Sequence, residues 1–172
     1  MPPNLESSTA KLVAKCQGLP LAIVALGGLM ASKSSITEWD GVYNNLNREL
    51  SENDTYFERL KYISFLSYHD LSYTLKQSFL YCCIFPEDYE IRRTSLIRLC
   101  MAEGFVKPLK GTVPEVVVER YISELICRGL LQVERRHASG RPKALKMHDI
   151  LREFVVSISK SMKFVAKSDG EE

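Results

Sequence analysis

The hydrophobic period of this sequence changes after Gly129, and that change limits the folds the chain can adopt. Before it, apolar residues recur every three to four positions, which is the spacing of amphipathic helices. After it, LLQVERR and KALKMH are strand-like runs on either side of the turn sequence HASGRP, which predicts a β-hairpin. ILREFVVSISKS then returns to helical spacing. We therefore expect a mainly α fold with a small β-hairpin.

Three helices are expected in the first fifty residues. The first ends before Gly18, a residue type that commonly follows a helix. The second, PLAIVALGGLMA, opens with Pro20 and is apolar all round, so we expect it to be buried on most faces. The third begins at the capping-box sequence SITE, Ser35 to Glu38. Together they predict a helical lobe of residues 1–52, which ends at the polar stretch SENDTYF.

A second lobe is expected over residues 53–161. Two of its helices surround SYHDLSYT, Thr94 is placed to cap a third, and Pro114 opens a fourth. Asp149 follows the hairpin and is placed to cap the last helix. This lobe thus has several helices and then a hairpin, which is the order of elements in a winged helix. The predicted architecture is therefore a helical bundle lobe followed by a winged-helix domain. Residues 162–172 are expected to be a linker.

Composition argues against a secreted, membrane or metal-binding protein. The chain has 172 residues, of which 45% are apolar, and a net charge of +2, too small to indicate nucleic acid by itself. Five cysteines without a C-x-x-C pair and three scattered histidines predict buried, reduced thiols and no metal site. The most apolar stretch, residues 19–31, is too short to span a bilayer, and the N-terminus lacks signal-peptide features. We therefore expect a cytoplasmic protein with no transmembrane segment.

Four stretches, in the order GLPLAIVALGG, FLYCCIFPEDYEI, LIRLCMAEGFV and MHD, together resemble one family. They look like motifs of the NB-ARC nucleotide-binding switch of plant intracellular immune receptors, and the resemblance covers Leu5 to about Ser161. The family usually has proline at the position of Ser72, cysteine at Ser78 and tryptophan at Cys100. We interpret these departures as variations in packing.

The resemblance implies roles for four residues toward ADP or ATP. Pro20 and Leu21 would pack against the adenine, His148 would reach the β-phosphate of ADP, and Asp149 would hold the helix start that aims His148. Each role has a structural alternative: Pro20 opens a helix, His148 ends a strand, and an N-cap aspartate contributes on the order of 1 kcal/mol without any ligand. A side chain just outside a helix N-terminus does lie where N–H groups and the helix dipole favour an anion.

The phosphate-binding half of such a switch is absent from this sequence. It contains neither G-x-x-x-x-G-K-[ST] nor an acidic strand end for magnesium, so we expect no enzymatic activity and weak or no nucleotide binding by this chain alone. The resemblance implies a regulatory part that closes over ADP in the off state. A P-loop domain and leucine-rich repeats would be its partners in cis, the repeats following the linker. Oligomerisation with other immune receptors is a further implication.

Two other functions remain open from the sequence. One is a nucleotide-independent interaction module that pairs with full-length receptors, suggested by the missing P-loop together with a Met1 start. The other is a winged-helix DNA-binding protein. The expected recognition helix, residues 114–128, has three glutamates and two arginines, a net charge of −1 that opposes phosphate binding. Basic residues on the hairpin favour DNA, but exposed hairpins are often basic for solubility: Arg135, Arg136, Arg141, Lys143 and Lys146. We therefore expect no DNA binding.

Overall fold

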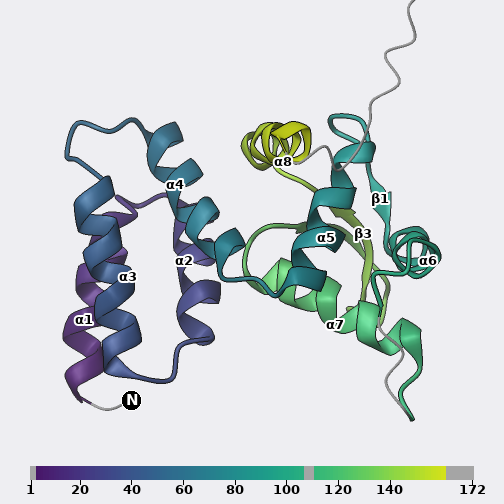
Figure 1. Ribbon diagram of the computed structural model, residues 1–172, viewed down its shortest axis with the longest axis horizontal. Coiled ribbons are helices and arrows are strands. Elements are labelled where there is room, and N and C mark those ends of the chain that lie inside the picture. The colour runs from purple at the N-terminus through teal and green to yellow at the C-terminus, as the bar shows by residue number, and fades with distance from the viewer. Residues whose placement is uncertain (1–2, 107–110, 162–172) are drawn as a thin grey trace, which may run out of the picture. The chain divides into compact units, whose positions relative to one another are not determined.

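The computed structural model describes residues 3–106 and 111–161, which form two compact units (Figure 1). The first, the helical unit, comprises Met1–Leu71 together with the short segment Cys127–Leu130. The second, the winged-helix unit, comprises Ser72–Ile126 and the chain from Leu131 onward. The predicted linker, residues 162–172, lies outside the described residues.

The helical unit contains α1 (Pro3–Lys15), α2 (Pro20–Ala31), α3 (Ile36–Glu49) and α4 (Tyr56–His69). Within it α1 packs against α3, and α2 packs against α4. The predicted capping box at Ser35 is confirmed, and Thr55 forms a second one with Glu58. The core consists of apolar side chains from all four helices, among them Leu12, Ala22, Leu26, Leu29, Leu46, Leu60 and Ile63.

The boundary expected after residue 52 needs correction, because the chain leaves the helical unit only after Leu71. The reason is the packing of α4 on α2 and the buried side chain of Arg59. Its guanidinium donates to the carbonyl oxygens of Lys15 at 2.9 Å and Ser51 at 2.7 Å, which ties α4 to the ends of α1 and α3. The polar stretch SENDTYF is thus a loop within one unit.

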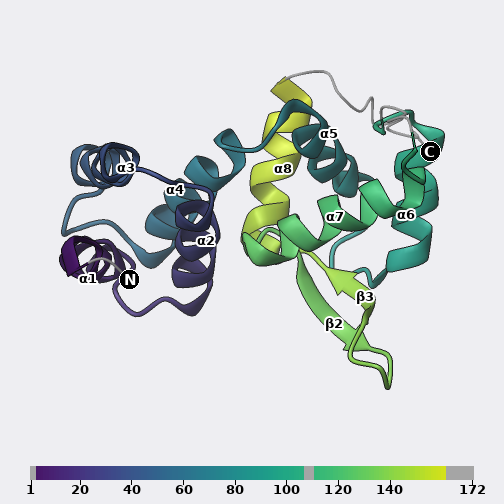
Figure 2. The same ribbon diagram turned by 90° about the horizontal axis from the view of Figure 1, so that it is seen from below.

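The winged-helix unit begins with α5 (Tyr73–Tyr81), the 3₁₀ turn η1 (Cys82–Ile84) and the short strand β1 (Ile91–Arg92). It continues with α6 (Arg93–Ala102) and α7 (Pro114–Cys127), whose last residue already belongs to the helical unit. The hairpin strands β2 (Gln132–Arg136) and β3 (Pro142–Lys146) lead to the last helix, α8 (Asp149–Ser161). Figure 2 shows this hairpin projecting from the unit.

The strands form an antiparallel sheet in the order β1-β3-β2, so the predicted mainly α fold with a small β-wing is confirmed. Leu145 of β3 pairs with Ile91 on one side and Val133 on the other. The two-residue strand β1 was missed because two residues are too few to display the alternation that predicts a strand.

Several local predictions need correction. Thr94 does not cap α6, because that helix starts at Arg93, one residue earlier. Helix α2 is not buried on most faces: Ile23 is 38% exposed and Val24 47%. Of the five free cysteines, Cys127 is exposed rather than buried.

The three residues that depart from the family pattern, Ser72, Ser78 and Cys100, have roles in helix capping, helix hydrogen bonding and core packing. Ser72 caps α5 by accepting the N–H of Leu75, Ser78 donates to the carbonyl of Thr74 within the helix, and Cys100 is buried in the core. Within the part of the chain that the structure describes, no helix is long and apolar enough to cross a membrane.

Candidate functional site

Pro20 occupies the first position of α2, where its missing N–H costs no helical hydrogen bond. Two consecutive residues with positive φ, Gln17 at 48° and Gly18 at 76°, reverse the chain between α1 and α2. Pro20 is exposed and Leu21 is half-buried. A Cβ built on Gly129 would lie 3.4 Å from Leu21 Cδ1, so Leu21 also has a packing role in the helical unit.

His148 occupies the position before α8. Its Nδ1 accepts the backbone N–H of Ile150 at 3.4 Å, and its carbonyl accepts the N–H of Arg152 at 2.9 Å, the first bond of the helix. The histidine is thus in the N-cap position and partly fills the role of a capping side chain. When Nδ1 accepts, the neutral ring carries its hydrogen on Nε2 and has one N–H left to donate.

Asp149 was predicted to be the N-cap, and the structure corrects this. Because the helix begins at Asp149 itself, the cap position belongs to His148. Asp149 is exposed in the first turn, where its charge still interacts favourably with the helix dipole. It also adds to the negative charge around Lys146, whose pKa is raised mainly by its hydrogen bond and ion pair with Asp88.

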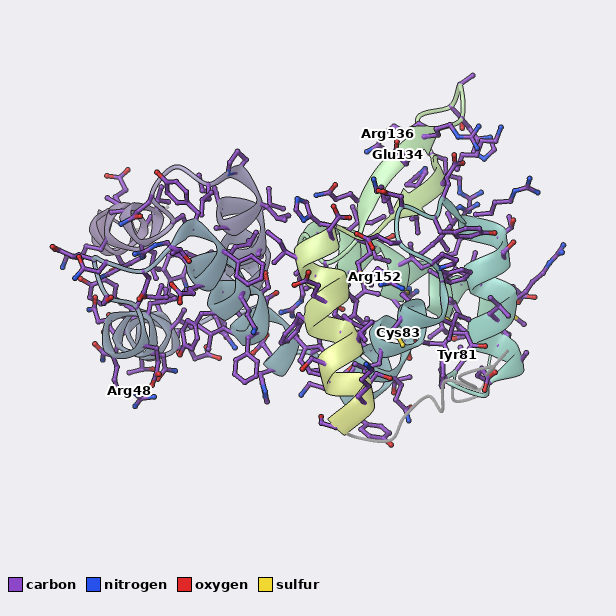
Figure 3. The ribbon with its side chains drawn as sticks, turned by 90° about the horizontal axis from the view of Figure 1, so that it is seen from above. Arg48, Tyr81, Cys83, Glu134, Arg136 and Arg152 are labelled. Atoms are coloured by element: carbon purple, nitrogen blue, oxygen red, sulfur yellow. The ribbon has the colours of Figure 1, made fainter. Side chains whose placement is uncertain are left out.

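The start of α8 is held in place by the turn that follows α5. Arg152, labelled on α8 in Figure 3, is the residue that makes this contact. It donates through Nε and Nη2 to the carbonyl oxygen of Phe85, at 3.4 and 3.2 Å. About two turns further along α8, Cys83 Sγ lies 3.5 Å from Ser159 Oγ. The four residues of the predicted nucleotide site are divided between the units. Pro20 and Leu21 belong to the helical unit, and His148 and Asp149 belong to the winged-helix unit.

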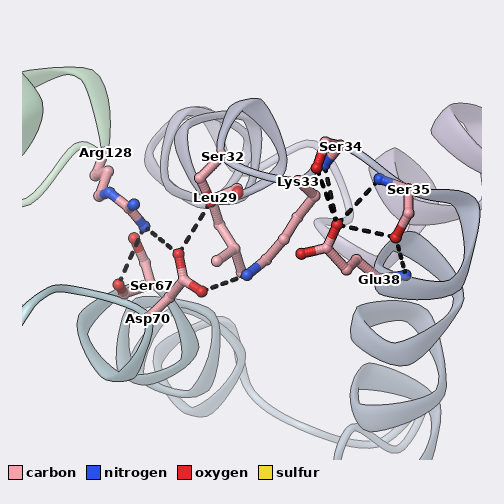
Figure 4. A network of polar contacts seen from close by, with 9 residues as sticks. All are labelled: Leu29, Ser32, Lys33, Ser34, Ser35, Glu38, Ser67, Asp70 and Arg128. Atoms are coloured by element: carbon pink, nitrogen blue, oxygen red, sulfur yellow. Dashed lines mark hydrogen bonds and ion pairs between the residues drawn. The ribbon is translucent and has the colours of Figure 1, made fainter.

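Sequence reasoning missed a polar network around Asp70, the C-cap residue of α4 (Figure 4). Its Oδ2 accepts from Ser32 Oγ and from Arg128 Nη1, both at 3.0 Å, and its Oδ1 forms a short ion pair with Lys33 Nζ. Arg128 also donates to the carbonyl of Ser67 at 3.5 Å. All five residues belong to the helical unit.

The electrostatics of this network favour a charged aspartate. Burial raises the pKa of Asp70, but hydrogen bonds from Lys33, Arg128 and Ser32 outweigh it, and the net shift is downward. The Arg128 side chain is only 5% exposed. Burying a guanidinium is costly unless its charge is paired or hydrogen-bonded, and Asp70 supplies the charged partner of Arg128.

The segment Cys127–Leu130, which we call the strap, is bound closely to α2. A Cβ on Gly28 would lie 2.5 Å from the carbonyl oxygen of Cys127 and 2.6 Å from Cα of Arg128, so only glycine permits this approach. Gly129 has a φ of +67°, and Leu130 is fully buried. The sequence placed Arg128 at the end of the expected recognition helix, residues 114–128. The burial of Arg128 could not be predicted, because a basic residue just before a helix-ending glycine is usually exposed.

The winged-helix unit has its own ion pairs, and these involve the basic hairpin. Arg135 pairs with Glu90, Lys146 with Asp88 at 2.6 Å, and Arg141 with Glu119 at 2.7 Å. Glu119 also pairs with Arg93. Three of the five basic hairpin residues are therefore already paired with carboxylates, which weakens the case for phosphate binding.

The remaining features carry little chemistry. An apolar pocket of about 330 Å³ in the helical unit is lined by α1, α2 and α3, including Ile23, Gly27 and Trp39. Burial raises the pKa of the Cys16 and Cys100 thiols to about 11, so these side chains are poor nucleophiles at neutral pH. Among residues 3–106 and 111–161 there is no group of three or more His, Cys, Asp or Glu residues that could hold a metal ion.

Residues 84–155 match the family model of the disease resistance protein winged-helix domain. The match runs from the last residue of η1 to the first half of α8. The chain belongs to the disease resistance protein family. It is 46% identical, over 98% of its length, to disease resistance protein RPM1 of Arabidopsis thaliana. It is 41% identical to disease resistance protein RPP13 and 36% identical to disease susceptibility protein LOV1 of the same plant, each over 94% of its length. It spans only about a fifth of these relatives, between 18% and 19% of their lengths.

Proposed function

We propose that this chain is a regulatory part of an ADP/ATP-dependent switch in a plant immune receptor, and that its units close over bound ADP in the off state. The similarity to disease resistance proteins supports a role in plant immunity. The four motifs in family order support the nucleotide switch. In this proposal the P-loop domain and the leucine-rich repeats are partners in cis.

The observation that carries the proposal is the position of His148 at the start of α8. With Nδ1 turned back to the N–H of Ile150, the neutral ring has one donor, Nε2–H, for a phosphate oxygen. Nearby N–H groups at the helix start and the helix dipole favour the same negative charge. Pro20 and Leu21 would contribute apolar surface for the adenine.

One hydrogen bond cannot operate such a switch alone. A net contribution of about 0.5–1.5 kcal/mol is far below the roughly 5.5 kcal/mol needed to move a two-state equilibrium from 1:99 to 99:1. His148 must therefore act together with the adenine contacts, the packing of the units and the domains outside this chain. We assign hydrolysis of ATP to none of the residues in this chain, which has no P-loop.

Two amide substitutions separate the roles of His148. Glutamine places an N–H near the position of Nε2 and so keeps a phosphate donor, whereas asparagine places its amide oxygen near Nδ1 and keeps the cap. In a full-length receptor carrying this segment, we expect His148→Gln to retain most of the co-purifying ADP and His148→Asn to lose it. The ADP released on denaturation is measured by chromatography, per mole of receptor.

Equal ADP content in the wild type, His148→Asn and His148→Ala would contradict the proposal. The nucleotide-independent interaction module would then be preferred, and it requires capture of a full-length receptor by this chain without nucleotide. Binding of a DNA duplex at physiological salt would instead favour the DNA alternative, against which the paired cations of the hairpin argue.

A further inference from the structure

The chain passes between the two compact units at three points: after Leu71, after Ile126 and after Leu130. Asp70 lies just before the first of these points, and Arg128 lies between the other two. The two side chains form an ion pair, with Arg128 Nη1 3.0 Å from Asp70 Oδ2. A single ion pair therefore ties together every point at which the chain crosses from one unit to the other.

The pair is built as an anchor rather than as a surface contact. Arg128 is 4% exposed, and Asp70 is further held by Lys33 and Ser32 from the loop after α2 (Figure 4). Removing one partner of a buried pair leaves the other charge without compensation, which is strongly unfavourable. Exposed pairs such as Arg48 with Glu49 contribute little by comparison.

A second contact fixes the same segment without using charge. The strap backbone lies directly on Gly28 of α2, at a distance that leaves no room for a Cβ. Leu130 buries its side chain completely in the same unit. The strap is thus held by the ion pair, by the close approach to Gly28 and by the burial of Leu130.

We propose that the Asp70–Arg128 pair is a joint that gathers the three chain crossings at one place in the helical unit. Connections held at one place allow two bodies to turn about it but prevent them from moving apart there. If the connections can separate, the two bodies can also shift along one another and rotate about further axes. Loss of the pair would loosen the strap, which then keeps only its contacts at Gly28 and Leu130, and widen the range of distances between the units. This inference does not depend on nucleotide binding.

The test is the distribution of distances between the units, measured without nucleotide by pulsed electron–electron resonance. Spin labels are carried by unnatural amino acids at Asn44, which is exposed on α3, and at Ala138, which is exposed in the β2–β3 turn. We expect Asp70→Asn and Arg128→Gln each to widen the distribution by about two-fold or more, because the crossings are no longer held together. Glu90→Gln, which removes the exposed pair with Arg135, should leave the width unchanged.

Gly28→Ala provides an independent route to the same state, since it displaces the strap without altering any charge. Its distribution should widen as well, while fluorescence of Trp39, the single tryptophan of the chain, reports whether the helical unit is still folded. Widths equal to the wild type in folded Asp70→Asn, Arg128→Gln or Gly28→Ala would overturn the joint. Unfolding of the helical unit in all three variants would also overturn it, because the contact would then be needed for folding.

Discussion

The imidazole Nδ1 of His148 accepts the backbone N–H of Ile150 at 3.4 Å, so this histidine caps the helix that it precedes. The same ring is the proposed phosphate donor through Nε2. Helix stability and ligand binding are therefore assigned to different nitrogens of one side chain. The start of α8 and the direction of the proposed donor cannot change independently.

The capping role predicts the effects of the two amides on stability. Asparagine at position 148 keeps an acceptor for Ile150 N–H, and we expect it to change the free energy of unfolding by less than about 0.5 kcal/mol. His148→Ala should lower it by about 0.5–1 kcal/mol, since the N–H loses its acceptor. Urea denaturation followed by circular dichroism gives these values. An alanine variant as stable as the wild type would show that the 3.4 Å contact contributes nothing.

Two adjacent glycines of α2 should respond oppositely to the same substitution. A Cβ on Gly27 meets open space, and alanine in a helix interior is favoured over glycine by about 0.5–1 kcal/mol, so Gly27→Ala should stabilise the helical unit. Gly28→Ala should destabilise it by about 1–3 kcal/mol, because the new methyl overlaps the strap backbone. Trp39 fluorescence during urea denaturation follows this unit. Equal shifts in both variants would disprove the close approach at Gly28.

Substitution of Arg59 should lower the stability of the helical unit strongly, although this residue is not part of the proposed nucleotide site. Its guanidinium binds the carbonyl oxygens of Lys15 and Ser51, near the C-terminal ends of α1 and α3, where a positive charge is favoured. Arg59→Met should lower the free energy of unfolding of the helical unit by about 1–3 kcal/mol, since two acceptors lose their donor. Arg48→Met, which removes an exposed pair, is the matched control and should change it by less than about 0.5 kcal/mol. Similar losses of unfolding free energy in the two variants would refute a stabilising role for the hydrogen bonds of Arg59.

The stability of the winged-helix unit should depend on pH through Glu119. Burial raises the pKa of its carboxyl, but hydrogen bonds from Arg141 and Arg93 lower it more, so the net shift is downward. A depressed folded-state pKa adds stability that is full above the unfolded pKa, about 4.3, and disappears as the pH falls through the folded value.

Glu119→Gln should therefore be less stable than the wild type at pH 7 by about 0.5–1 kcal/mol, because solvent screens these partly exposed pairs, and the difference should shrink below about pH 4. Urea denaturation at several pH values, followed by circular dichroism, measures it. Glu153→Gln, which removes an exposed carboxyl from α8, is the matched control variant. A loss for Glu119→Gln that is the same at pH 7 and pH 3.5 would mean that packing, not charge, is responsible.

Local sequence patterns predicted the helices well because their signals lie within a few residues. The capping box at Ser35, the proline openings at Pro20 and Pro114 and the hairpin turn are all of this kind. The predicted helix starts were wrong by one residue at α8, where the cap is His148 and not Asp149, and by two at α6, where the cap is Arg92 and not Thr94. A capping residue and a first-turn residue have similar preferences, so the sequence does not separate them.

The long-range features could not be predicted. Nothing near Asp70 in the sequence points to Arg128, because the two side chains meet only after the whole of α5, α6 and α7 has been formed. The same holds for Arg59, whose partners are carbonyl oxygens that carry no side-chain signature. Of the candidate site, the positions of Pro20 and His148 at helix starts were predicted, and the network around Asp70 was not.

The strap has a consequence for the synthesis of the protein. The ribosome makes the residues up to Leu71 before it makes the strap, so the place for Leu130 in that unit stays empty until all of residues 72–126 have been made. Closing such a distant contact is slow compared with forming the local helices. During that interval the strap of a neighbouring nascent chain can occupy the empty place, which is the route to a domain-swapped dimer. Rapid completion of the chain therefore protects the helical unit from pairing with the wrong copy.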